Sequence, residues 1–265
     1  MRGASRASYA ILREQLGGPG LDSRIGDELF AVTGLLDAEH GLRRALSDPG
    51  KPAAEKAAVA HQLLRGKVSA ATENLTAAAT EQRWGSPSDL SDGIEELAIE
   101  ATVAGATSKQ QLDDLEDDLF RFSRLVAAEP DLRQALTGDV PADGKQSLVA
   151  SLLRNKVSPV ALALISQLVA HPRGRSLTAS LDLAAGIAAK RREQLIATVR
   201  SVAPLTDAQQ QRLATALQTA YGHEIHLNVV IDPTVVGGIS VQIGDELIDG
   251  TAASQLAAVR RKLAS

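Results

Sequence analysis

An internal repeat in the first two thirds of the chain is the feature that most limits the folds available to it. FAVTGLLDAEHGLRRALSDP, which starts at Phe30, aligns with FRFSRLVAAEPDLRQALTGD, which starts at Phe120, at an offset of 90 residues. After a loop, LLRGKVS from Leu63 aligns with LLRNKVS from Leu152 at an offset of 89 residues. A period this long indicates a duplicated domain and not a short solenoid repeat.

Each copy is predicted to be a bundle of helices joined by loops that contain proline or glycine. The loops DPG at 48–50 and DVP at 139–141 follow the two LR-x-AL helices. Ser158-Pro159 suits a helix start, because a proline in the first turn needs no amide partner. GSPSDLSDG, residues 85–93, is rich in turn residues and marks the predicted join between the copies. The helical pattern after it can close the first bundle, open the second, or serve both.

A third part begins near Glu193, where the patterns change from helix to strand. The β-branched residues of LIATVRSVAPL suggest a strand. Thr206 with Gln209 fits a capping box, and Gly222 ends the helix that follows. Aliphatic residues then alternate with others from 225 to 231, which predicts a strand with one well-buried face.

The end of the chain completes this third part. A further strand is expected after Gly237-Gly238, and Thr251 can cap a last helix. The apolar stripe of that helix would be Leu256, Val259 and Leu263. We therefore predict strand, helix, hairpin, helix for the C-terminal part.

The fold class that follows is mainly α. Two tandem helical bundles are expected at residues 1–92 and 93–192, and a small α/β domain at 193–265. The chain has 265 residues, of which 44% are hydrophobic but only 2% aromatic, so its core must consist of Ala, Leu, Val and Ile, as in closely packed helices.

Composition also excludes several classes of function. A net charge of -4 argues against a nucleic-acid-binding protein. The absence of cysteine excludes disulfides, thiolate nucleophiles and Cys-ligated metals. No signal-peptide core or membrane-spanning apolar run is present, so any work at a membrane requires partners to hold the chain there.

No motif of the sequence predicts a reactive or ligand-binding site. Gly237-Gly238 lacks the Lys-Ser or Lys-Thr ending of a P-loop, and a strand follows it, so a close-packed bend is favoured over a phosphate loop. His223-x-x-His226 spans a predicted helix end and strand start and has no acidic third ligand at helical spacing, so metal binding there is not predicted. No Gly-x-Ser-x-Gly elbow is present. The sequence predicts no catalytic, cofactor-binding or metal-binding residue.

Two helical stretches are candidates for partner binding. VALALISQLVAH, from Val160, is apolar almost all round, which favours a central core helix over a groove for a partner helix. The candidate groove residues are Leu162, Ile165, Leu168 and Val169. An acidic run is interpreted as a solvated outer surface that could attract a basic partner. Its members are Asp113, Asp114, Glu116, Asp117 and Asp118.

The stretch IDPTVVGGISVQIGDELIDGT, residues 231–251, resembles the delta subunit of bacterial rotary ATP synthases, called OSCP in mitochondria. The family pattern is aliphatic-Asp-x-x-aliphatic, small-Gly, an aliphatic strand, a Gly-Asp turn and Ile-Asp-Gly-Ser/Thr. LVAAEPDLRQAL, SLLRNKVSPVALALISQLVAH and RSVAPLTDAQQQRLATAL also resemble the family, so the resemblance covers residues 119–265. The added helical copy is similar to an arrangement of actinobacterial members. The matching motif residues are Ile231, Asp232, Val235, Gly237, Gly238, Gly244, Asp245, Ile248, Asp249, Gly250 and Thr251.

This resemblance implies a non-catalytic stator subunit of a proton-translocating rotary ATP synthase, without cofactors. Such a subunit sits at the top of the peripheral stalk, links the catalytic head to the membrane sector and resists rotor torque. Its helical domain holds the N-terminal helix of an alpha subunit of the alpha/beta head, and its C-terminal domain meets the far end of a b-type stalk subunit. The implied location is the cytoplasmic face of the cell membrane.

We expect the second copy to be the alpha-binding domain, because it connects directly to the C-terminal domain. Two alternatives remain open at this point. One is a free-standing helical adaptor that binds another partner helix. The other is a nucleotide-responsive enzyme that uses the glycine hairpin.

Overall fold

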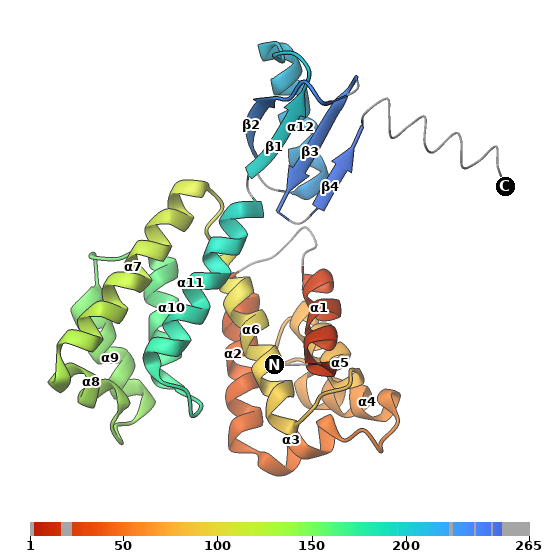
Figure 1. Ribbon diagram of the computed structural model, residues 1–265. Helices are drawn as coiled ribbons and strands as arrows, with labels where there is room; N and C mark the ends of the chain where they lie inside the picture. The colour runs from red at the N-terminus through yellow and green to blue at the C-terminus, as the bar shows by residue number, and fades with distance from the viewer. Residues whose placement is uncertain are drawn as a thin grey trace. The chain divides into compact units, whose positions relative to one another are not determined.

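The computed structural model describes residues 3–16, 23–194, 196–222, 225–235, 237–244 and 246–250. These residues form twelve helices and four strands (Figure 1). They divide into two compact units, one of residues 1–106 with 113–188 and one of 107–112 with 189–265. The mainly α fold class with a small α/β part is thereby confirmed.

The helices of the first unit repeat in the order that the sequence predicts. The first copy consists of α1 (Ala4–Leu16), α2 (Ser23–Ala38), α3 (His40–Ser47), α4 (Ala53–Leu64), α5 (Ala70–Glu81) and α6 (Pro87–Val103). The second consists of α7 (Lys109–Ala128), α8 (Pro130–Thr137), α9 (Ala142–Leu153), α10 (Pro159–Ala170) and α11 (Leu177–Gln194). Helices α3, α4 and α5 match α8, α9 and α10 in length, at offsets of 90, 89 and 89 residues.

The duplication extends to helix caps and to unusual buried groups. Ser69 and Ser158 are the N-caps of α5 and α10, and each accepts a hydrogen bond from a backbone N–H in the first turn. Lys56 of α4 and Lys145 of α9 are at equivalent positions, and both are buried, at 5% and 6% exposure. Two copies therefore share packing details that the apolar pattern alone does not specify.

The predicted loop at residues 85–93 is wrong from its third residue onwards, because α6 begins at Pro87. Ser86 caps this helix by accepting a hydrogen bond of 3.2 Å from the backbone N–H of Asp89, and Pro87 fits the first turn. Gly93 lies inside the helix because Trp84 packs where a side chain would be. A Cβ at position 93 would lie 2.5 Å from the Trp84 ring.

Helix α6 is the central helix of the first unit. Its Leu90, Ile94, Leu97 and Ile99 are fully buried. It contacts α1, α2, α3 and α5 of the first copy and also α10 of the second, so it serves both copies. The division into 1–92, 93–192 and 193–265 stays a prediction, and its first boundary falls within this helix.

The second unit contains a four-stranded sheet in the order β2-β1-β3-β4. Its strands are β1 (Ile196–Ser201), β2 (His226–Ile231), β3 (Ile239–Ile243) and β4 (Glu246–Asp249). Helix α12 (Asp207–Tyr221) connects β1 to β2, which run parallel, whereas β3 pairs antiparallel with both β1 and β4. The capping box at Thr206 and the left-handed Gly222 cap are confirmed.

The core of this unit lies on the face of the sheet that α12 covers (Figure 1). Alternate residues of β1 and β3 meet there, since Ala197 pairs with Ile243 and Val199 with Val241. Leu217 of α12 packs onto the same cluster. Strand β1 is therefore the central strand that organises the unit.

The hairpin predicted around Gly237-Gly238 is wrong, because β1 lies between β2 and β3. The hairpin of this unit is instead β3 with β4. Strand β2 is also less buried than predicted, with Ile231 56% exposed, because it is the edge strand. The predicted last helix, with Thr251, Leu256, Val259 and Leu263, lies outside the described residues.

Candidate functional site: two partner-binding surfaces

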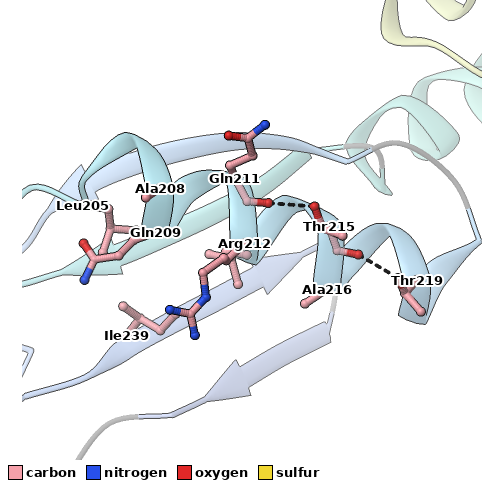
Figure 2. Close-up of a pocket in the computed structure, with 10 residues that line it drawn as sticks. Leu205, Ala208, Gln209, Gln211, Arg212, Thr215, Ala216, Thr219 and Ile239 are labelled. Carbon is pink, nitrogen blue, oxygen red and sulfur yellow. Dashed lines mark hydrogen bonds between the residues drawn. The ribbon is translucent and has the colours of Figure 1, made fainter.

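A groove of about 1030 Å³ lies along α12 in the second unit. Ala208, Arg212, Ala216 and Thr219 are exposed and lie on one face of the helix, because they follow the spacing of helical turns. Figure 2 shows Arg212 extending from α12 near Ile239 of β3. The other lining residues are Leu205, Gln209, Gln211, Leu213 and Thr215.

Two threonine hydroxyls of this groove are satisfied within α12 itself. The Thr215 hydroxyl donates a hydrogen bond of 2.9 Å to the carbonyl of Gln211, and Thr219 donates one of 2.8 Å to the carbonyl of Thr215 (Figure 2). Both hydroxyls thus have partners within the helix. The two alanines beside them also have small side chains, so the surface would allow a partner helix to approach closely.

The first half of the family motif forms the loop between β2 and β3. Asp232 follows β2, and its carboxylate accepts hydrogen bonds of 2.9 and 2.6 Å from the N–H and hydroxyl of Thr234. These bonds lower the pKa of Asp232. Val235 accepts a hydrogen bond of 3.2 Å from the N–H of Gly237. The aspartate therefore shapes the turn that follows β2.

Gly237 and Gly238 have φ angles of 69° and 78°, which side chains rarely adopt. Both are exposed, so they serve the backbone conformation of the turn and not the close packing that the sequence suggested. No phosphate-binding helix follows them, since β3 begins at the next residue.

The second half of the motif forms the β3–β4 hairpin. Gly244 has a φ of 55° at the turn, and Asp245 lies outside the described residues. Ile248 and Asp249 end β4, with Ile248 41% exposed. The N–H of Gly250 donates a hydrogen bond of 3.0 Å to the carbonyl of Ile239.

The predicted groove residues of α10 lie mostly in the core. Ile165, Leu168 and Val169 are at most 1% exposed, whereas Leu162 is half-buried. Exposed apolar side chains of the second copy lie instead on α7, where Phe120 is 62% and Leu125 40% exposed, and at Val140 in the loop before α9. Phe30, the equivalent of Phe120 in the first copy, is only 6% exposed.

The acidic run of α7 is predicted to be a solvated outer surface, but this is only partly correct. Asp118 is buried, at 8% exposure, and its carboxylate accepts a hydrogen bond of 2.8 Å from the backbone N–H of Ser158. Asp114 and Asp117 are exposed as expected. Asp118 therefore holds the start of α10, and only part of the run can face a partner.

Sequence reasoning missed the α12 surface. The signal was present, since Ala208, Arg212, Ala216 and Thr219 recur at helical spacing, but small and polar residues on a helix are usually solvated. It also missed the exposure of Phe120, which depends on which helices surround it.

The described residues contain neither a helix that could span a membrane nor a cluster that could hold a metal ion. No helix within the described ranges is long and apolar enough to cross a membrane. In the same part of the chain, no group of three or more His, Asp or Glu residues could hold a metal ion. His226 is exposed at the start of β2, and His223 is not among the described residues.

Comparison with known proteins identifies the family. The family model for the ATP synthase delta (OSCP) subunit matches residues 99–263. The chain belongs to the ATP synthase delta (OSCP) subunit family. It is therefore a structural subunit of the ATP synthase stalk and not an enzyme.

Similar delta subunits match the chain over its full length. The ATP synthase subunit delta of Thermobifida fusca is 44% identical over 268 residues, and that of Streptomyces griseus is 44% identical over 270, each covering 100% of both chains. That of Nocardia farcinica is 39% identical over 265 residues, covering 99% of this chain and 98% of the relative. The added first copy is thus shared with actinobacterial delta subunits.

Proposed function

We propose that this delta subunit is the stator adaptor that joins the catalytic head to a b-type subunit of the peripheral stalk and resists rotor torque. The observation that carries the proposal is the family match, which begins at residue 99 inside α6 and continues through the second copy and the C-terminal unit. Helices α1 to α5 and most of α6 then lie outside the residues that the family model matches.

The α12 groove is the proposed binding site for the stalk subunit. Its alanine and threonine surface suits an apolar helix, and burying apolar area there contributes about 25 cal/mol per Å². No reactive side chain is needed for such a contact. The b-type subunit is expected to contact α12 through the apolar face of its terminal helix.

The second copy is the proposed binding site for the N-terminal helix of an alpha subunit. An exposed phenylalanine whose duplicate is buried in the first copy supports this, because aromatic anchors dominate binding energy at interfaces. The Arg124 guanidinium lies 6.0 Å from the centre of the Phe120 ring, which keeps a positive charge beside the apolar anchor.

Two substitutions test the sites separately in the full-length chain. Ala216→Arg should abolish binding of a soluble b-type segment, and Gln218→Arg, exposed elsewhere on α12, is its control. Phe120→Ser should weaken binding of an alpha N-terminal peptide at least tenfold, whereas Leu162→Ser should not. If Leu162→Ser weakened peptide binding and Phe120→Ser did not, the peptide would instead bind on α10.

Mass analysis of intact membrane complexes tests the stator role itself. One copy of this chain should migrate with the alpha and beta subunits. The proposed location of that complex is the cytoplasmic face of the membrane. Migration as a free protein under the same conditions would favour the alternative, a free-standing helical adaptor.

A further inference from the structure

Arg173 is almost completely buried although it lies in the loop between α10 and α11. Its side chain is only 7% exposed. Its φ of 47° lies in the left-handed region, which residues other than glycine rarely adopt. A loop arginine in this state requires compensating contacts.

Those contacts come from the first copy. The guanidinium Nη1 lies 2.6 Å from Oε2 of Glu95, and Nη2 lies 3.1 Å from Oδ1 of Asp92, both on α6. Nη2 also donates a hydrogen bond of 2.7 Å to the hydroxyl of Ser91. Nε pairs with the carboxylate of Asp37 at the end of α2. Arg173 of the second copy thus binds two helices of the first.

The charges around this arginine balance. Three acidic residues, Asp37, Asp92 and Glu95, face Arg173 and two further arginines. Arg43 binds Asp37 at 2.9 Å, and Arg175 pairs with Glu95. Because Glu95 is only 3% exposed, removal of Arg173 would leave a buried carboxylate with Arg175 as its one remaining ion-pair partner in this cluster.

The equivalent loop of the first copy has a different function. Between α5 and α6 it carries Arg83, which is exposed, and Trp84, which is buried. The indole N–H of Trp84 donates a hydrogen bond of 2.8 Å to the carbonyl of Ala79 in α5. One copy of the loop therefore closes its own bundle, and the other reaches across to its neighbour.

We propose that Arg173 is a positioning residue that locks the second copy to the first, so that the added copy is a rigid extension of the family core. Helix α6 contacts both copies and provides one connection. The Arg173 loop provides a second, at residues 91–95 of α6 and at α2. Two connections fix the angle between the copies, which a single connection would leave free to vary. The inference holds whichever partner binds the chain.

Distance measurements in the full-length chain test this lock. The chain has no cysteine, so Val59→Cys and Val140→Cys, at exposed positions of the first and second copies, place one spin label on each. Pulsed electron paramagnetic resonance should give one narrow distance distribution. Arg173→Ala should broaden it or add a second distance, with helical content unchanged.

Arg83→Ala, in the equivalent loop of the first copy, is the matched control and should keep the distribution narrow. An unchanged distribution in folded Arg173→Ala would overturn the proposal. If that variant loses helical content, Arg173→Lys decides, because it keeps the charge but not the forked geometry. Broadening in folded Arg173→Lys supports the lock, and an unchanged width refutes it.

Discussion

Glu28 of α2 holds the start of α5 through Ser69. Its carboxylate accepts hydrogen bonds of 3.0 Å from the N–H and 2.6 Å from the hydroxyl of Ser69, and one of 2.7 Å from Thr72. Ninety residues later, Asp118 of α7 accepts a hydrogen bond of 2.8 Å from the backbone N–H of Ser158 at the start of α10. In each copy, a carboxylate from an earlier helix thus binds the N-terminus of an equivalent helix, where negative charge is favourable.

Glu28→Gln should lower the free energy of unfolding at pH 7 by about 2 kcal/mol. Burial raises the pKa of Glu28, but the hydrogen bonds from Ser69 and Thr72 outweigh it and lower the pKa to about 2. Because the pKa of Glu28 is lower in the folded state, its carboxylate stabilises the fold at pH values above the unfolded pKa of 4.5. This contribution is lost as the pH falls towards 2.

Urea denaturation at several pH values checks this. The difference between Glu28→Gln and the parent should shrink from pH 7 towards pH 3. Asp118→Asn, which affects one hydrogen bond, should lower the free energy of unfolding at pH 7 by less than Glu28→Gln does. A difference for Glu28→Gln that is independent of pH would contradict the assignment.

Gly93→Ala should destabilise the first copy by about 1 to 2 kcal/mol, because overpacking the buried Trp84 ring outweighs the gain of about 1 kcal/mol in helix propensity. The new Cβ would lie 2.5 Å from the ring. Fluorescence of Trp84, the single tryptophan, follows the transition. Gly34→Ala, where nothing lies within 4 Å, should be neutral or stabilising, and equal effects of the two variants would refute the steric cause.

Gly238→Val should destabilise the C-terminal unit by about 1 to 2 kcal/mol and leave the helical bundles intact, because a β-branched residue is strained at positive φ. Gly238→Asn should cost less, since asparagine tolerates this conformation. Thermal unfolding followed by circular dichroism measures both. If the two variants lose equal stability, lack of space and not backbone conformation explains the glycine.

Tyr9→Phe should lower the free energy of unfolding by about 1 kcal/mol, because the Tyr9 hydroxyl donates a hydrogen bond of 2.9 Å to Glu100. Burial and then the charge of Glu100 raise the pKa of Tyr9 above its usual value of 10. Stability from this group is present below pH 10 and is lost as the pH rises further.

Denaturation between pH 8 and pH 11 measures that loss. It should be weaker in Tyr9→Phe than in the parent, and identical alkaline profiles would show that Tyr9 is not responsible.

Local signals in the sequence predicted most of the helices and strands. Ser158-Pro159, the Thr206 capping box and Gly222 mark helix ends by chemistry within a few residues, and all three are confirmed. The turn residues up to Gly93 were misleading, because most of them lie inside α6. Gly93 is suited to this helix since the ring of Trp84, which precedes the helix, fills the space that a side chain would need. The candidate surfaces were harder to predict, since exposure depends on neighbours distant in sequence.

The sequence by itself determined the duplication, the fold class and the family, because these rest on repeated and ordered residue patterns. Only the tertiary structure decided that Phe120 is exposed while Phe30 is buried, and that β1 separates β2 from β3. It also decided that Arg173 binds Asp37 across an interval of 136 residues. Pattern and spacing act along the chain, whereas burial and charge pairing depend on which segments meet in space.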